Sequence, residues 1–388
     1  MDQARLITLA ERLGLTTRHL NRLFTRHLGA SPGAVARTRR LHFAKRLLDD
    51  TDLPVGDVAL AAGYGSVRRC NDEFLKIYGR SPSQLRRKTK LQQPPGGFSL
   101  RLRYRPPLHW TNLLAFFGRR VIPGIELVTG ESYTRSIATG KSAGWFRISS
   151  LPDEPVLELA LHGVEPSSLM TWVRRIRQQF DLDCDPRELA EVFGKDPLLG
   201  KAWHEAEGLR LPGSTGAFET CVRAILGQQV SVAAARTLCS RLVARYGMSL
   251  DLVDAPVTKL FPTPEKLQRV KLEKIGVMPQ RACAIRSLAA SVQRGDVDFY
   301  CGDVEVVSKK LLSIPGIGPW TVDYVRMRAL GDPNAFPADD VIIRDYLGKG
   351  KRLDSNKVHA LSRGWQPWRA YAAVLIWQHQ FKDQSDKS

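Results

Sequence analysis

The stretch LLSIPGIGPWT at residues 311–321 predicts two helices joined by a short hairpin. Gly316 and Gly318 permit positive φ angles and a close approach of another backbone. Free amides at the start of the second helix, near Thr321, can bind a phosphate group. We expect these three residues to lie against a DNA backbone, which such a hairpin holds without reading its sequence. Standing alone, the Gly-x-Gly pattern would more simply mark one helix ending and another beginning.

A second element follows at Phe336–Arg344, where Asp339 and Asp340 precede a short helix. The helix dipole and the free amide donors favour a carboxylate anion at this position. Such an anion can face a positive charge that develops on a bound molecule. The simpler alternative, that both carboxylates only cap the helix, is expected to hold for Asp339 and less so for Asp340.

The hairpin and the Pro-x-Asp-Asp element together resemble the helix-hairpin-helix, Gly/Pro/Asp superfamily of base-excision glycosylases. From Phe98 to the C-terminus, the chain more closely resembles bacterial 3-methyladenine DNA glycosylase II, the AlkA type. Four further motifs carry this resemblance, namely LPG at 211–213, AILGQQVSV at 224–232, FPTP at 261–264 and PWRAY at 367–371. The resemblance implies excision of alkylated bases from double-stranded DNA, with Asp340 as the catalytic carboxylate.

Three aromatic residues are candidates for a base pocket. Trp320 and Tyr324 are four residues apart on one predicted helix and therefore share a face, while Trp377 lies on the C-terminal helix. Aromatic residues at this spacing more often belong to a core, but the resemblance implies that all three line the pocket. Their electron-rich faces attract a positively charged alkylated base by about 0.5–2 kcal/mol each.

The resemblance also implies a hydrolytic reaction. A cationic base is already a good leaving group, so the site needs an anion beside the sugar C1′ and a water molecule. Bifunctional relatives carry a Lys just after the hairpin, where this chain has Pro319 and Trp320, so strand cleavage is not expected. Gln229 occupies the wedge position that fills the vacated base stack, where the family pattern has Leu. Val341 replaces a pocket Tyr.

Residues 1–90 carry 18 Lys and Arg against 8 Asp and Glu, so this segment holds +10 of the chain's net charge of +19. Their pattern predicts two helix-turn-helix units, whose second helices bear several arginines. A charged helix is more often just a solvated face, but two turn-containing copies favour DNA binding. The arginines that we expect to contact DNA are Arg18 and Arg22 in the first unit and Arg68 and Arg69 in the second.

This segment resembles the AraC-type DNA-binding domain, and AGYGSVRR at 62–69 with SPSQLRR at 81–87 is most similar to the version in Ada alkylation-response regulators. Two function classes therefore stay open. In the first, an active glycosylase gains DNA affinity from residues 1–90. In the second, the chain is a transcriptional regulator whose C-terminal part senses damage or is degenerate. The presence of Asp340 and the three aromatic residues favours the first.

Activity on oxidised bases is disfavoured by the absent Lys and by the absence of a cysteine cluster after Cys301. The sequence leaves open which lesions are preferred among N3- and N7-alkylpurines, hypoxanthine and O2-alkylpyrimidines. It also leaves open whether the helix-turn-helix units recognise a promoter or bind DNA generally.

We expect a mainly α-helical chain with a small α+β domain. Antiparallel strands are predicted at 98–104, 133–139, 144–149 and 156–161, and the chain turns almost wholly helical after Asp185. The predicted parts are a tandem helix-turn-helix domain at 1–90, a Pro- and Gly-containing linker at 91–97, an antiparallel sheet-and-helix domain at 98–185, and an all-α helix-hairpin-helix domain at 186–388.

The composition narrows the partners. A pI near 9.9 indicates a polyanion such as nucleic acid, with a membrane surface as the weaker alternative. No apolar run reaches the ~18 residues of a membrane span and no signal peptide is evident, so a cytoplasmic protein is expected. The six cysteines show no C-x-x-C spacing, which predicts reduced thiols and no metal site. We expect a monomer with no metal and no nucleotide cofactor.

Removing residues 1–90 should flatten the salt dependence of DNA affinity, because each phosphate contact that is lost reduces the slope of log K against log salt by about 0.9. Binding of the full and shortened chains to duplex DNA between low and physiological salt measures this slope. Unchanged affinity and slope in the shortened chain would refute the expectation.

Overall fold

The computed structural model describes residues 3–51, 53–86, 96–139, 142–151 and 154–385. It divides into two compact units, one of residues 1–101 with 160–173 and one of residues 102–159 with 174–388. Most of the predicted linker, residues 91–95, lies outside the described part, and the first strand begins at Gly97, the last residue of that linker. Among the described residues, no helix is both long enough and apolar enough to cross a membrane.

The first unit contains two copies of a helix-turn-helix pattern, and their caps repeat at an interval of 50 residues. Thr16 and Ser66 cap the second helices by accepting a backbone N–H three residues on. Each of these helices ends at a glycine in the left-handed region, Gly29 at φ 67° and Gly79 at φ 66°. The helices of this part are α1 (Gln3–Arg12), α2 (Thr17–Leu28), α3 (Pro32–Asp50), α4 (Val55–Ala61), α5 (Val67–Tyr78) and α6 (Pro82–Leu85).

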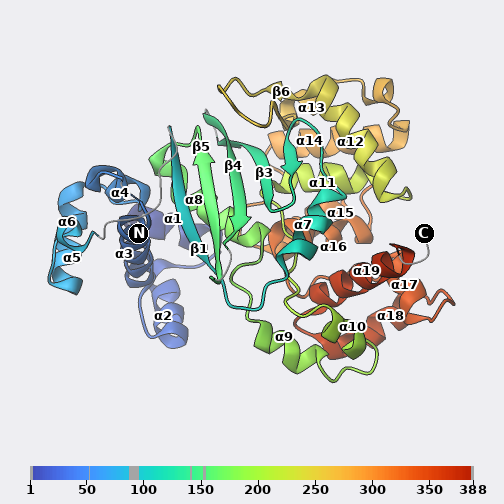
Figure 1. Ribbon diagram of the computed structural model, residues 1–388, viewed down its shortest axis with the longest axis horizontal. Coiled ribbons are helices and arrows are strands. Elements are labelled where there is room, and N and C mark those ends of the chain that lie inside the picture. The colour runs from blue at the N-terminus through green and yellow to red at the C-terminus, as the bar shows by residue number, and fades with distance from the viewer. Residues whose placement is uncertain (1–2, 52, 87–95, 140–141, 152–153, 386–388) are drawn as a thin grey trace. The chain divides into compact units, whose positions relative to one another are not determined.

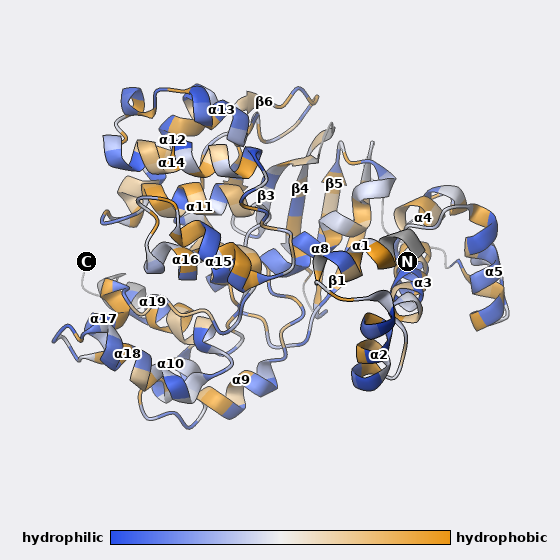
Figure 2. Cartoon of the chain, turned by 180° about the vertical axis from the view of Figure 1, so that it is seen from behind, coloured by the Kyte–Doolittle hydropathy of each residue, from blue (hydrophilic) through white to orange (hydrophobic). Residues whose placement is uncertain are grey.

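The two second helices, α2 and α5, are amphipathic. Figure 2 shows hydrophilic and hydrophobic bands alternating along both of them. Leu20 and Phe74 face the interior and are buried. The four predicted DNA-contacting arginines, Arg18, Arg22, Arg68 and Arg69, are exposed on these helices.

A five-stranded antiparallel sheet follows in the order β1-β5-β4-β3-β2. Figure 1 shows β1, β5, β4 and β3 side by side. The register of β3 on β4 pairs Tyr133 with Ile148 and Arg135 with Phe146. The short edge strand β2 was not predicted, because three residues are too few to show alternation. The elements are β1 (Gly97–Arg103), α7 (Trp110–Gly118), β2 (Glu126–Val128), β3 (Ser132–Thr139), β4 (Ser142–Ser150), β5 (Val156–His162), the 3₁₀ turn η1 (Pro166–Ser168) and α8 (Leu169–Gln179).

The rest of the chain is helical apart from one two-stranded ribbon, β6 (Met248–Ser249) with β7 (Lys259–Leu260), which the sequence did not indicate. The prediction of a mainly helical chain with a small antiparallel sheet is thus confirmed. The helices are α9 (Pro186–Phe193), α10 (Gly200–Glu205), α11 (Ala217–Leu226), α12 (Val232–Tyr246), α13 (Pro264–Arg269), η2 (Leu272–Ile275), α14 (Pro279–Gln293), α15 (Val304–Leu312), α16 (Pro319–Val325), η3 (Arg326–Leu330), α17 (Val341–Leu347), α18 (Ser355–Leu361), η4 (Ser362–Trp365) and α19 (Arg369–Ser385).

These helices bury two separate hydrophobic cores. One is built mainly by α11, α12, α14, α15 and α16, and the other by α9, α10, α17 and α19. The segment formed by α16 and η3 contributes to both, since Val322 and Val325 belong to the first core and Met327 to the second. Because η3 is a π-helical turn, which is frequent at functional sites, this segment is a natural place for a site between the cores.

Asp181, between α8 and α9, connects three distant segments. Its Oδ2 accepts the Leu211 amide at 2.9 Å and the Tyr371 hydroxyl at 2.8 Å. The residue has a φ of 51°, a left-handed conformation that Asn adopts at low cost. Burial raises the pKa of Asp181 to about 6, so ionisation near neutral pH opposes folding.

Asp181→Asn should therefore stabilise the chain at pH 8 and have little effect near pH 4. The folded-state pKa is raised, so the stabilising contribution of the neutral carboxyl is present at low pH and lost as pH rises through about 6. A rise from 3.8 to about 6 corresponds to about 3 kcal/mol for a fully buried group. Because Asp181 is half-buried, we expect a gain of about 1 kcal/mol at pH 8.

Urea unfolding of both proteins at pH 4 to 8 checks this, with the exposed Asp251→Asn as the matched control. If the free energy of unfolding of Asp181→Asn differs from that of the parent by the same amount at every pH, this carboxyl does not titrate as described.

Candidate active site

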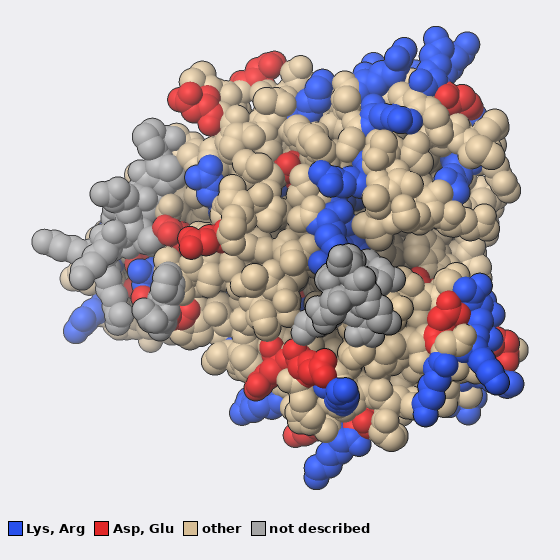
Figure 3. Space-filling model, turned by 45° about the vertical axis from the view of Figure 1, so that its right-hand side comes forward, with Lys and Arg blue, Asp and Glu red and all other residues tan. Residues whose placement is uncertain are grey.

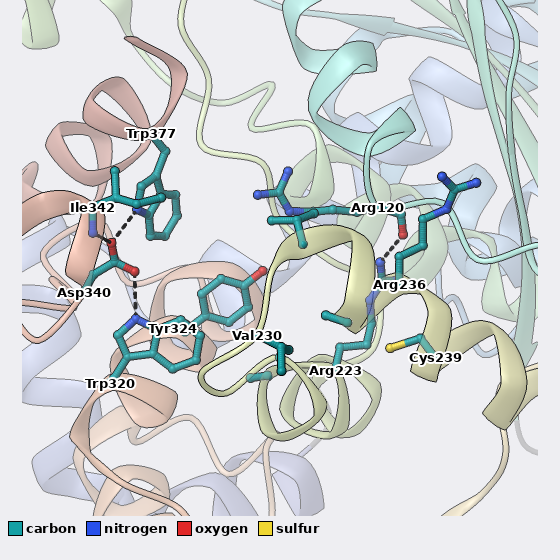
Figure 4. A pocket seen from close by; sticks show the side chains of 14 residues that line it. Arg120, Arg223, Val230, Arg236, Cys239, Trp320, Tyr324, Asp340, Ile342 and Trp377 are labelled. Carbon is teal, nitrogen blue, oxygen red and sulfur yellow. Dashed lines mark hydrogen bonds between the residues drawn. The ribbon is translucent and has the colours of Figure 1, made fainter. Parts of the chain in front are cut away.

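A cavity of about 200 Å³ lies where the two helical cores meet. A dry cavity of about 150 Å³ holds a benzene ring, so this one has room for a planar heterocycle. Figure 4 shows Asp340 and the aromatic residues on one side and arginines on the other. The lining residues are Arg120, Arg223, Ala224, Gly227, Val230, Val232, Ala235, Arg236, Cys239, Trp320, Tyr324, Asp340, Ile342 and Trp377.

The Asp340 carboxylate is held by four hydrogen bonds. Oδ1 accepts the backbone amides of Ile342 at 3.0 Å and Ile343 at 3.2 Å, and the indole Nε1–H of Trp377 at 3.1 Å. Oδ2 accepts the indole Nε1–H of Trp320 at 2.9 Å. Since the donors come from α16, α17 and α19, the carboxylate is fixed in one orientation at the cavity wall.

The expectation about the two adjacent carboxylates was wrong in one respect. Asp340, and not Asp339, is the N-cap of α17, with extended backbone angles of φ −63° and ψ 127°. Only a residue at this position can direct its side chain to the second and third amides of the helix. Asp339 is exposed and lines an outer groove. Capping and cavity lining are therefore combined in Asp340.

The three aromatic residues predicted for a pocket do lie together. Trp320 and Tyr324 are stacked with ring centroids 5.4 Å apart and an interplanar angle of 19°. Trp377 is 6.2 Å from Tyr324. Because both indole N–H groups donate to Asp340, the rings are held in place by the carboxylate that they flank. Val341, expected beside the carboxylate, is half-exposed and lines the outer groove, while Ile342 lines the cavity.

Tyr324 is held by arginines that the sequence did not single out. The buried Arg328 on η3 donates to its hydroxyl oxygen at 2.6 Å and to the carbonyl oxygens of Pro212 and Gly213. Burial acts to raise the pKa of Tyr324, but the charges of Arg328 and Arg120 outweigh it and lower the pKa. The phenol oxygen thus acts as an acceptor toward the arginines.

The opposite wall depends on a buried ionic network. Arg135 pairs with Glu126 and Glu219, and Arg223 pairs with the same two carboxylates at 3.2 and 3.1 Å. Burial disfavours the Glu126 anion, yet Arg223 and Arg135 together lower its pKa. Arg223 also donates to the Arg120 carbonyl oxygen at 2.6 Å, which fixes the loop after α7 at the cavity. This network joins the sheet to α11.

An outer groove lies beside the cavity and is lined by the loop after α11, the hairpin and the start of α17. Gln229 is exposed at the tip of the loop, with a φ of 53° that is unusual for a residue other than glycine. Gly316 has a φ of 89°, and a Cβ there would lie 2.9 Å from the Ala284 Cβ. A Cβ on Gly318 would meet open space, so this glycine leaves the groove accessible.

The hairpin and the loop are tied together by Gln228. Its Nε2 donates to the Gly316 carbonyl oxygen at 2.9 Å and to the Thr321 hydroxyl at 3.0 Å. Its own carbonyl oxygen accepts a hydrogen bond from Arg281 on α14. Thr321 is almost fully buried, at 1% exposure, and its hydroxyl supports the loop. The phosphate contact expected of the amides near Thr321 stays a prediction.

The site therefore combines a fixed anion, electron-rich rings and a cavity that adjoins the outer groove. The lining residues include no lysine, so no side chain in the cavity offers an amine nucleophile. The arrangement is suited to stabilising a cation next to a bound planar molecule while water attacks it.

Comparisons with known proteins agree with this geometry. Family models match residues 9–88 (helix-turn-helix domain), residues 99–216 (AlkA N-terminal domain) and residues 222–369 (HhH-GPD superfamily base excision DNA repair protein). A solved 3-methyladenine DNA glycosylase from Archaeoglobus fulgidus shares the fold, with a TM-score of 0.63 and 23% identity over 72% of this chain and 96% of that one.

Two curated relatives are more similar in sequence. A Mycobacterium tuberculosis protein named probable bifunctional transcriptional activator/DNA repair enzyme AlkA is 36% identical over 95% of this chain and 75% of its own length. The Escherichia coli DNA-3-methyladenine glycosylase 2 is 35% identical over 71% of this chain and 95% of its own. The chain thus belongs to the AlkA family of DNA glycosylases, within the HhH-GPD superfamily, and carries a helix-turn-helix domain before the glycosylase part.

Proposed function

We propose that the cavity receives an alkylated base turned out of double-stranded DNA and that Asp340 assists hydrolysis of its glycosidic bond. The observation that carries this proposal is the Asp340 carboxylate, oriented by two indole N–H groups at the edge of an aromatic cavity. The named activity of the Escherichia coli relative supports a lesion of the 3-methyladenine type.

In this proposal each residue has a separate part. Trp320, Tyr324 and Trp377 present ring faces to the base, and a cationic base gains about 0.5–2 kcal/mol from each favourable contact. As the glycosidic bond breaks, positive charge grows at C1′ and the fixed Asp340 anion stabilises it. Water then adds to C1′. With no lysine in the lining, the product is an abasic site in an intact strand.

The outer groove supplies a path for the DNA backbone. The hairpin offers the amides around Gly318 to a phosphate. In this proposal Gln229, which has a left-handed backbone conformation, fills the stack that the extruded base vacates. Backbone strain of this kind persists only where the surroundings fix it, and Gln228 with Arg281 provides that support.

The helix-turn-helix part adds basic surface. A separate basic surface is visible in Figure 3, where Lys and Arg side chains gather at the upper right and at the lower right edge, over helices of the second unit. With a net charge of +19, the chain attracts polyanions, and the exposed arginines of α2 and α5 are placed on the second helices that read DNA in such units. We propose that they contact duplex DNA.

Asp340→Asn should reduce release of 3-methyladenine from alkylated duplex DNA by about 10²–10³-fold, the usual effect of removing a preorganised group that stabilises charge in the transition state. Asn is also a good N-cap, so α17 should remain folded. Released base, abasic sites and strand breaks are scored separately, and Asp339→Asn is the matched control. Full release by Asp340→Asn would exclude this carboxylate, while spontaneous nicking by the parent would contradict a monofunctional enzyme.

Gln228→Ala should lower kcat/KM on the same substrate by about tenfold, because it removes two hydrogen bonds of about 1 kcal/mol each between the loop and the hairpin. Thermal unfolding should change little, since the residue is not in either core. Gln268→Ala, an exposed glutamine on α13, is the control. Equal kinetics for both variants would show that the tie between loop and hairpin has no part in catalysis.

A further inference from the structure

Arg120 places a guanidinium group inside the cavity. The residue follows α7, and its Nη1 donates to the Phe116 carbonyl oxygen at 3.2 Å. Its guanidinium carbon lies 3.8 Å from the centroid of the Phe116 ring. Figure 4 shows the side chain extending from the arginine-bearing wall toward the Tyr324 hydroxyl, across the cavity from Asp340. The group is therefore fixed and directed at whatever occupies the cavity.

The charge of Arg120 is not neutralised locally. Among the described residues, the carboxylates of this wall, Glu126 and Glu219, pair with Arg135 and Arg223, and none pairs with Arg120. Burial lowers the pKa of Arg120 to about 10, which still leaves it charged at neutral pH. On one wall, the Asp340 carboxylate already accepts four hydrogen bonds. On the other wall, the Arg120 guanidinium has further N–H groups that can donate to a bound molecule.

We propose that Arg120 is a specificity-determining residue that donates a hydrogen bond to a carbonyl oxygen of the extruded base and so favours neutral, carbonyl-bearing bases such as hypoxanthine over cationic aminopurines. The inference rests on the proposed function and deepens it. It assigns to the cavity a second recognition device, opposite in charge preference to the aromatic rings.

Two adenine-derived lesions distinguish the Arg120 contact from the contacts of the aromatic rings. Hypoxanthine carries a carbonyl oxygen where 3-methyladenine carries an amino group. A guanidinium has donors only, so at this position it can bind the carbonyl oxygen and cannot bind the amino group. A positively charged 3-methyladenine is also repelled by Arg120. Only the aromatic rings attract the cationic base, through cation–π interactions.

Arg120 would also assist departure of the neutral base. The C1′–N9 bond breaks with its electron pair moving to the base, and the negative charge spreads onto the carbonyl oxygen, where Arg120 stabilises it. Water adds its hydroxyl group to C1′, and its remaining proton neutralises the departed base. The cationic lesion leaves as a neutral molecule and needs no such help.

The test compares Arg120→Met and Arg120→Gln with the parent in single-turnover excision from duplex DNA containing hypoxanthine or 3-methyladenine. Arg120→Met should lower hypoxanthine excision by about tenfold or more, while 3-methyladenine excision stays equal or rises. Arg120→Gln keeps a neutral donor and should show a smaller loss in the same direction. The exposed neighbour Arg119, which does not line the cavity, gives the control Arg119→Met.

The ratio of the two rates decides the outcome, and 3-methyladenine excision reports in the same experiment that the variant is folded. An unchanged ratio in both Arg120 variants, or an equal loss on both lesions, would overturn the inference and leave Arg120 a structural residue. A parent protein that excises neither lesion would instead contradict the proposed function.

Discussion

Four hydrogen bonds that converge on the Asp340 carboxylate hold the site together. They bring an indole from α16, an indole from α19 and two amides of α17 to one anion, and so join segments from both sides of the boundary between the cores. A charge with this many donors is stabilised without a counter-ion. The same bonds fix the aromatic rings, which means that the geometry of the cavity and the position of the anion are set by one interaction.

The wall facing Asp340 is held by ion pairs, in which each of two buried carboxylates contacts two arginines. Glu126 and Glu219 are shared by Arg135 and Arg223, so two negative charges balance two positive ones inside the protein. Arg223 then holds the Arg120 backbone through a hydrogen bond. Buried ion pairs contribute little net stability, and their value here is that they place the arginine wall with precision.

Outside the cavity, the groove depends on backbone conformation more than on charge. Gly316 is required by a positive φ and by the close Ala284 side chain, while Gly318 leaves open space. Gln228 connects Gly316 and Thr321 to the loop that carries Gln229. The hairpin and the loop that carries Gln229 therefore form one connected surface next to the cavity mouth.

The sequence by itself determined the helices and the hairpin, because caps, periodicity and glycine positions act over a few residues. The choice of Asp340 as the candidate carboxylate came from a family resemblance. The same resemblance also placed Trp320, Tyr324 and Trp377 together. Tertiary structure alone decided that Asp340 is both cap and cavity wall, that Thr321 is buried, and that Arg120 enters the site. Arg120 and Asp340 lie far apart in the chain and line one cavity, and an arrangement of that kind arises from packing of the two cores, which no local pattern records.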